Sequence, residues 1–187
     1  MAKFTDSPIL TDRYTKAVNL VLQLHSNQIR KGHVECPYIT HLLTVSSLVL
    51  EGGGTEDEAI AALLHDSIED VDYSLDSIKQ QFGDNVAQIV DDLSEDKNHP
   101  SPKDNYIKRM QTANLSVIRV SLADKLHNAR CYVINSHLIN KKVVDFFVKL
   151  YKVYSTRKNL MLCSQIKELD ELDHLISEME KLIRKRG

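Results

Sequence analysis

A dense group of ionisable side chains, the segment His-Asp-Ser-Ile-Glu-Asp, occupies residues 65–70 and places one imidazole and three carboxylates in six positions. Residues 59–64 before it are strong helix formers, and Thr55 with Glu58 forms a capping box, so we expect the segment near the C-terminal end of a helix. That end already carries negative partial charge, and neighbouring carboxylates repel one another. A divalent cation would relieve the repulsion, whereas a solvated acidic helix end with an isolated histidine is the alternative interpretation.

The spacing within this segment favours convergence around one site. His65 and Glu69 are four positions apart, as are Asp66 and Asp70. In a helix, each pair would stack on one of two adjacent faces. All four side chains are therefore candidates for metal binding or for acid and base chemistry.

Two further segments, each with one candidate ligand, extend this set. Two imidazoles and two carboxylates give the mixed nitrogen and oxygen ligation that suits manganese, iron or zinc. The candidate ligands are His41, His65, Asp66 and Asp124. Taken singly, His41 at a helix start is typical of a cap or a partly exposed histidine, and Asp124 could pair with a neighbouring basic residue. The order of all four is much more specific than any one of them.

Composition limits the class of protein. The 187 residues suffice for one well-packed domain, and 42% hydrophobic with 27% charged residues is an ordinary globular balance. We find no apolar run long enough to span a membrane, no signal-peptide region, and three widely spaced cysteines without a CxxC motif, which predicts a cytoplasmic protein with reduced thiols. A net charge of −2 argues against general nucleic-acid binding, so an anionic ligand needs a local pocket.

Nearly every segment shows helical periodicity, which predicts an all-α fold with one core. Residues 95–103 contain two prolines and no apolar side chain, and they form the clearest loop. We expect a single helix through the acidic segment, and helices over residues 11–26, 40–51, 74–82, 84–94, 104–111, 116–135, 143–163 and 169–186.

The order of these motifs resembles that of the HD phosphohydrolases, and more closely the hydrolase domain of the RelA/SpoT alarmone enzymes. The resemblance covers roughly residues 10–160 and rests on Gln-Ile-Arg-Lys at 28–31, Pro-Tyr-Ile-Thr-His at 37–41, Ala-Ala-Leu-Leu-His-Asp at 61–66 and Leu-Ala-Asp-Lys-Leu-His-Asn at 122–128. It implies an HD-domain helical bundle that forms one domain over residues 1–187. Nothing in the chain resembles the synthetase domain of the long family members, so we expect a stand-alone small alarmone hydrolase.

That family removes pyrophosphate from the ribose 3′ position of guanosine tetra- or pentaphosphate with the help of Mn²⁺. The resemblance therefore implies Mn²⁺ as the cofactor and a small-molecule nucleotide as the substrate. A divalent cation activates water near neutral pH and offsets charge at the attacked phosphorus. The implied roles are metal binding by His41, His65, Asp66 and Asp124, handling of water by Glu69 and Asp70, and nucleotide binding by Arg30, Lys31 and Asn128. Further candidates for phosphate contacts are Lys97, Lys103, Lys108 and Arg109.

The choice of nucleotide stays open at this point. Cys131 stands where the long alarmone enzymes usually carry a threonine. Relatives of this compact type accept adenosine alarmones or the 2′-phosphate of NADPH, and the same metal site would serve each. A general nucleotidase acting on mononucleotides is a further alternative, as is a nucleotide-sensing module without turnover. We expect neither nucleic-acid nor membrane partners, and the oligomeric state is left open.

Overall fold

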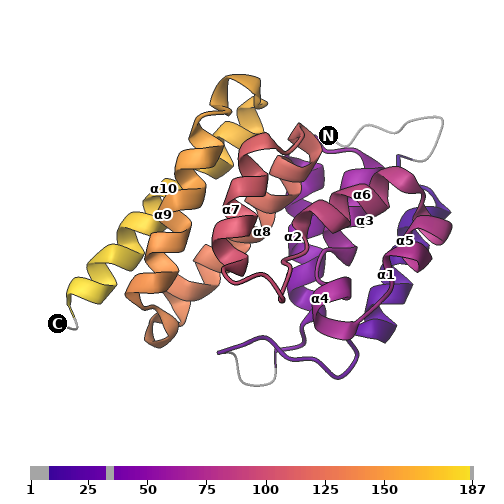
Figure 1. The fold of residues 1–187 in the computed structure, drawn as a ribbon, viewed down its shortest axis with the longest axis horizontal. Coiled ribbons are helices and arrows are strands. Elements are labelled where there is room, and N and C mark those ends of the chain that lie inside the picture. The colour runs from indigo at the N-terminus through magenta and orange to yellow at the C-terminus, as the bar shows by residue number, and fades with distance from the viewer. Residues whose placement is uncertain (1–8, 33–35, 186–187) are drawn as a thin grey trace, which may run out of the picture.

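The computed structural model describes residues 9–32 and 36–185. Over these residues the chain forms ten α-helices, two 3₁₀-helices and no β-strand, which confirms the predicted all-α class (Figure 1). None of the described helices is long and apolar enough to cross a bilayer. Arg186, the predicted end of the last helix, lies outside the described residues. The elements are α1 (Asp12–Leu24), α2 (Ile39–Glu51), α3 (Glu56–Leu64), α4 (Ser67–Val71), α5 (Leu75–Phe82), α6 (Asp84–Leu93), α7 (Pro102–Thr112), α8 (Leu115–Ile134), η1 (Ser136–Leu138), α9 (Lys141–Ser155), η2 (Lys158–Leu160) and α10 (Cys163–Arg184).

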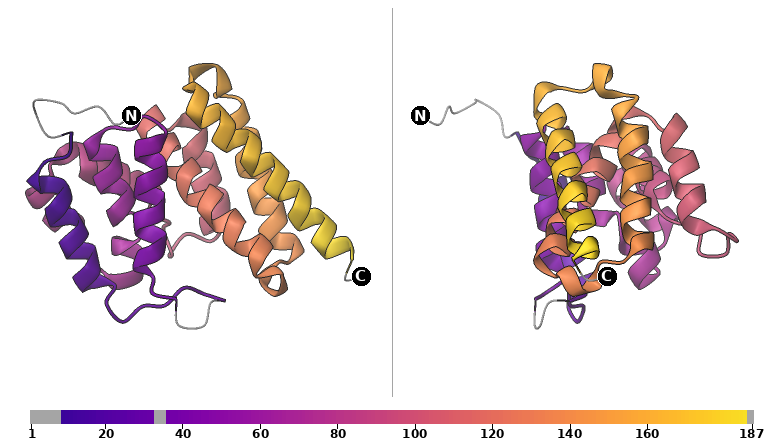
Figure 2. Two further views of the ribbon diagram at one scale, coloured as in Figure 1. Left: turned by 180° about the vertical axis from the view of Figure 1, so that it is seen from behind. Right: turned by 90° about the vertical axis from the view of Figure 1, so that its left-hand side faces the viewer.

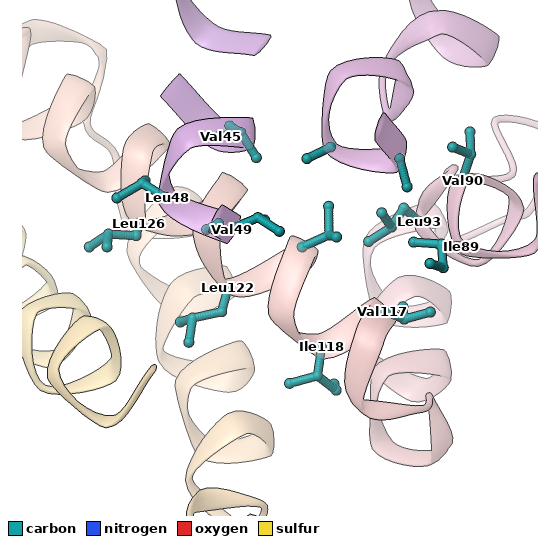
Figure 3. Close-up of a cluster of buried hydrophobic side chains, with 14 of the residues drawn as sticks. Val45, Leu48, Val49, Ile89, Val90, Leu93, Val117, Ile118, Leu122 and Leu126 are labelled. Atoms are coloured by element: carbon teal, nitrogen blue, oxygen red, sulfur yellow. The ribbon is translucent and has the colours of Figure 1, made fainter. Parts of the chain in front are cut away.

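Helix α3 lies at the centre of the packing. All of its residues from Glu58 to Leu64 are buried, because it packs against α1, α2, α6 and α8. A helix that is apolar on every side has no face left for solvent. Figure 3 shows Val49 of α2 and Leu122 of α8 in the adjoining apolar cluster. Each fully buried side chain of this size contributes roughly 1.5–3 kcal/mol, so this packing holds the ends of α3 in place.

The N-terminus of α3 has the predicted capping box. The backbone N–H of Thr55 donates to Glu58 Oε2 at 2.7 Å, and the N–H of Glu58 donates to Thr55 Oγ1 at 3.3 Å. Glu58 Oε2 also accepts a hydrogen bond from Arg119 of α8. The cap therefore links the start of α3 to the helix that carries Asp124.

The C-terminus of α3 differs from our prediction of one helix through the acidic segment. The helix ends at Leu64, and α4 begins at Ser67, so His65 and Asp66 lie between two helices. His65 Nδ1 donates to the carbonyl of Ala62 at 2.7 Å, and a side chain thereby satisfies one of the carbonyls at the helix end.

This break changes the setting of the acidic pair. Glu69 and Asp70 lie in the first turn of α4, and Asp72 closes that helix in the left-handed conformation at φ +52°. The first turn is where the helix dipole favours negative charge. The prediction that this acidic pair lies at the C-terminal, negative end of a helix is therefore wrong.

The boundary between the last two long helices also differs from the prediction, since α9 ends at Ser155 and α10 begins at Cys163. The hydroxyl of Thr156 donates to the carbonyl of Val153 at 2.7 Å, and the N–H of Leu162 donates to Gln165 Oε1 at 2.8 Å. Such local bonds compete with helical ones and end or begin helices. Both views of Figure 2 show α10 alongside α8 and α9.

Helix α10 also contributes to the placement of α8. Arg130 of α8 donates from Nε and Nη2 to the two carboxylate oxygens of Glu171 at 2.7 and 2.9 Å. A bidentate pair of this kind fixes orientation as well as distance. Together with the buried apolar contacts, it holds α8 against the C-terminal helix.

Candidate active site

Three parts of the fold bring the four candidate metal ligands together. His41 lies in the first turn of α2, His65 and Asp66 lie in the break between α3 and α4, and Asp124 lies in the middle of α8. The packing of α3 against both α2 and α8 brings these segments to one place.

The two imidazoles face the same two carboxylates. His41 Nε2 lies 3.2 Å from Asp124 Oδ1 and 3.6 Å from Asp66 Oδ2. His65 Nε2 lies 3.1 Å from Asp66 Oδ2 and 3.7 Å from Asp124 Oδ1. One donor atom from each of His41, His65 and Asp66 lies within 4.8 Å of the others. The four predicted residues therefore converge on a volume that one cation could share.

The hydrogen bonds of His65 fit a metal ligand. Its Nδ1 donates to the Ala62 carbonyl, which leaves the lone pair on Nε2. Nε2 is buried, faces the carboxylates, and makes no hydrogen bond of acceptable geometry with any described residue. A buried nitrogen without a hydrogen bond is costly unless another partner binds it. Two nitrogens and two carboxylate oxygens form a donor set that suits Mn²⁺, Fe²⁺ or Zn²⁺.

The electrostatics of the cluster favour cations. Burial lowers the pKa of His65, but the carboxylates of Asp66 and Asp124 raise it more, so it lies well above its usual value. Burial opposes the ionisation of Asp66 and Asp124, but nearby cationic groups hold the pKa of each carboxyl below its usual range. His65 has this effect on Asp66, and Lys125 has the strongest such effect on Asp124. Both carboxylates stay ionised, and a bound metal would replace the proton that they favour on His65.

A second layer of side chains orients the ligands. The hydroxyl of Tyr38 donates to Asp66 Oδ2 at 2.6 Å, and burial and the charge of Asp66 raise the Tyr38 pKa, so the group stays a donor. Asn128 Nδ2 donates to Asp124 Oδ1 at 2.6 Å, and Lys125 Nζ donates to Asp124 Oδ2 at 2.5 Å. Partners of this kind fix ligand orientation and tune metal affinity.

The predicted catalytic pair divides between two places. Glu69 lines the pocket of about 140 Å³ that contains the four candidate ligands. Burial raises its carboxyl pKa, and its Oε1 accepts the N–H of Glu95 at 2.7 Å. Asp70 is not part of the pocket lining, and its Oδ2 accepts a hydrogen bond from Gln28 Nε2 at 2.7 Å. The structure therefore brings Glu69, but not Asp70, to the candidate metal site.

A larger cavity of about 540 Å³ adjoins this pocket and contains the three predicted nucleotide-binding residues. Arg30 Nη2 donates to Asn128 Oδ1 at 2.8 Å, and its guanidinium lies 5.4 Å from the ring centroid of Tyr38. Lys31 lines the same cavity. A lining of cationic and aromatic side chains suits a phosphorylated nucleotide.

Of the four basic residues that we expected as further phosphate contacts, Lys103 alone lines this cavity. Arg109 instead donates to the carbonyls of Asp91 and Ser94. The lining residues to which sequence analysis assigned no role are Tyr38, Lys125, Tyr132, Leu138, Asn140, Lys142, Val143, Phe146 and Phe147. The sequence could have indicated Lys125 as a site residue, because it lies close to Asp124 and Asn128 in the chain. No pattern in the sequence indicated the cavity residues of α9.

An all-α fold that places two histidines and two aspartates in this order around one pocket defines the HD class of proteins. The family model for the HD domain matches residues 17–158, and the chain belongs to that family.

The chain is similar to curated hydrolases. It is 35% identical over 119 residues to guanosine-3′,5′-bis(diphosphate) 3′-pyrophosphohydrolase MESH1 of Xenopus tropicalis, and 34% identical over 119 residues to the human protein of that name; each match covers 62% of this chain and 66% of the relative. It is 36% identical over 114 residues to guanosine-3′,5′-bis(diphosphate) 3′-pyrophosphohydrolase of Haemophilus influenzae, covering 57% of this chain and 16% of the relative. The matched region thus spans just under two thirds of the MESH1 relatives and a small part of the longer one.

Solved structures share the fold. One, described as "A metazoan ortholog of SpoT hydrolyzes ppGpp and plays a role in starvation responses", matches with a TM-score of 0.70 at 25% identity over 100% of this chain and 99% of that chain. Another, lmo0812 from Listeria monocytogenes EGD-e, matches with a TM-score of 0.69 at 26% identity over 78% of this chain and 96% of that chain.

Proposed function

We propose that the protein is a metal-dependent hydrolase that removes pyrophosphate from the ribose 3′ position of guanosine tetra- and pentaphosphate, leaving GDP or GTP. The main support for this proposal is that two cavities of different size adjoin each other. A pocket of about 140 Å³ holds the candidate metal ligands, and a cationic cavity of about 540 Å³ adjoins it. The similarity to named 3′-pyrophosphohydrolases supports the same reaction.

The sizes of the two cavities indicate where each part of such a substrate would bind. At roughly 30 Å³ for each water, the smaller pocket has the volume of about four to five waters, which suits a phosphoryl group and its attacking water. The larger cavity has room for a nucleoside and offers aromatic side chains for the base. The phosphate to be cleaved would therefore lie among the candidate ligands, and the nucleoside beside Arg30 and Lys31.

The residues of the smaller pocket would divide the work. His41, His65, Asp66 and Asp124 would hold Mn²⁺. When bound, such a cation lowers the pKa of a water and offsets charge at phosphorus. Glu69 has a raised pKa and would accept the proton of the attacking water, while Asp70 would hold the segment before α2 in place through Gln28.

We also propose where the protein acts and on what. The described cysteines are free thiols, which fits a reducing cytoplasm, and a net charge of −2 fits a small nucleotide better than a nucleic acid. We further propose that residues 1–187 act as one domain, because the helices of both halves share one buried core.

A direct test incubates the purified protein and Mn²⁺ with ppGpp, ppApp, NADPH and a deoxynucleoside triphosphate in parallel, with a chelator in matched samples. We expect pyrophosphate from ppGpp only in the samples without chelator. Faster turnover of ppApp or release of phosphate from NADPH would reassign the substrate. Binding of ppGpp with no product from any compound would replace the enzyme by a nucleotide sensor.

A further inference from the structure

The two cavities share part of their lining, and the shared residues are Tyr38, Lys125 and Asn128. If the proposed function holds, the scissile phosphorus lies on one side of these residues and the nucleoside on the other. The bond between phosphorus and the 3′ oxygen would then cross the shared lining. The group that meets the leaving 3′ oxygen would be one of these three side chains.

Two of the three side chains are neutral, and their described contacts leave at most one N–H or O–H group to donate. The hydroxyl of Tyr38 donates to Asp66 Oδ2 at 2.6 Å. The amide of Asn128 donates to Asp124 Oδ1 at 2.6 Å and accepts from Arg30 at 2.8 Å. Neither side chain carries a charge that could offset a developing alkoxide.

Lys125 differs in both respects. Among the described residues its ammonium donates one hydrogen bond, to Asp124 Oδ2 at 2.5 Å, and an ammonium has three N–H groups. Its side chain is 15% exposed. Nζ lies 4.9 Å from the ring centroid of Tyr106 and 6.0 Å from that of Phe146, so a fixed cation faces the junction in surroundings where charge interactions are strong.

We propose that Lys125 is a catalytic residue for the leaving group: its ammonium donates a hydrogen bond to the ribose 3′ oxygen as the bond to phosphorus breaks. The water oxygen forms the new bond to phosphorus, and the electron pair of the broken bond moves to the 3′ oxygen. One proton of the water passes to Glu69, and the 3′ oxygen takes a proton from solvent, which leaves a ribose hydroxyl and pyrophosphate. Lys125 supplies charge at the oxygen in this step and loses no proton.

The experiment compares ppGpp with an analogue in which sulfur replaces the bridging 3′ oxygen. A thiolate leaves without help from a cation, so the analogue removes the need for Lys125. The variants are Lys125→Met, Lys125→Arg, which keeps the charge, and Lys103→Met as the matched control, because Lys103 lines only the larger cavity. Calorimetric titration of each variant with Mn²⁺ gives a readout that does not depend on turnover.

For Lys125→Met we expect kcat on ppGpp to fall by about 10²–10³-fold and kcat on the sulfur analogue to change much less. Mn²⁺ should bind this variant at least as tightly as the wild type, because a positive charge beside Asp124 is removed. Lys125→Arg should keep most of the activity, and Lys103→Met should raise KM equally for both substrates. Equal losses on both substrates, or loss of Mn²⁺ binding, would overturn the proposal. Failure of the wild-type protein to cleave either compound would instead contradict the proposed function.

Discussion

The Nδ1 atoms of His41 and His127 lie 2.6 Å apart, with the two rings inclined by 19°. Burial lowers the pKa of both imidazoles, that of His127 to about 4, so both are neutral at pH 7. One ring must donate its single N–H to the other. If His41 is the donor, its Nε2 presents a lone pair to the site shared with Asp66 and Asp124. In that arrangement His127 fixes the tautomer that a metal ligand needs.

This relationship predicts that His127→Phe weakens Mn²⁺ binding by about 10–100-fold, because the ring volume stays while the acceptor is lost. Calorimetric titration with Mn²⁺ measures the change. His174→Phe, on the exposed face of α10, is the control and should bind Mn²⁺ as the wild type does. Unchanged affinity in His127→Phe would show that the contact does not orient His41.

Metal binding and proton transfer are assigned to different residues, so substitutions in the two groups should have different effects. Asp66→Asn should lose Mn²⁺ and activity together, since it removes a charged ligand. Glu69→Ala should keep the metal and lower kcat by about 10²–10⁴-fold. Equilibrium dialysis and steady-state rates separate the two.

Asp70 lies outside the pocket, so we predict different effects for substitution of Asp70 and of Glu69. Asp70→Ala should lower kcat less than Glu69→Ala, because Asp70 contacts Gln28 and not the pocket. The double variant should resemble Glu69→Ala. Full activity in the double variant would contradict the role given to Glu69.

Arg30→Ala should raise KM by about 10–100-fold and change kcat much less, since the guanidinium lines the larger cavity and not the pocket of the candidate metal ligands. Initial rates over a range of ppGpp concentrations measure both constants. Lys108→Ala, outside the cavity lining on the neighbouring helix α7, is the control. A fall in kcat at constant KM would place Arg30 at the chemistry instead.

Glu168 predicts a pH dependence of stability. It packs against Gly52 at the C-terminal end of α2, where carbonyls carry negative partial charge. Burial raises its pKa from 4.5 to about 7, with Arg130 and Arg119 opposing the shift and Glu51 and Glu171 adding to it. The folded-state pKa is above the unfolded one, so this contribution to stability is full below about pH 4.5 and is lost as pH rises through about 7.

Glu168→Gln should therefore stabilise the protein at pH 8 by roughly 1–2 kcal/mol, after a discount for partial exposure, and should have little effect at pH 4.5. Urea unfolding of both proteins at the two pH values measures the difference. An equal effect at both would exclude ionisation as the cause.

The sequence predicted helices well where local chemistry marks their ends. The capping box of Thr55 and Glu58 is one such mark. The break at His65 and Asp66 has no glycine or proline to signal it, and these side chains make their contacts with His41 of α2 and Asp124 of α8, which are distant in sequence. The predicted end of the helix at residue 163 lies beyond the end of α9 at Ser155, because local hydrogen bonds of Thr156 and Leu162 separate the two helices without a glycine or proline to mark the boundary.

The candidate site was predictable to the extent that residue type and order define it. His41, His65, Asp66 and Asp124 converge as expected from their motifs. The partner of His41 was not predictable, because His127 lies 86 positions away and the contact depends on how α2 and α8 pack. Likewise, no local pattern indicated that only one member of the acidic pair would reach the pocket.

The most direct test of the central claim is the fate of solvent oxygen in a reaction of ppGpp with the Mn²⁺-loaded protein in ¹⁸O-labelled water. Attack at phosphorus within the pocket of His41, His65, Asp66 and Asp124 predicts one ¹⁸O atom in each pyrophosphate and none in GDP. Mass spectrometry of the two products gives the answer. Label in the 3′ hydroxyl of GDP, or no hydrolysis with Mn²⁺ bound, would contradict the account.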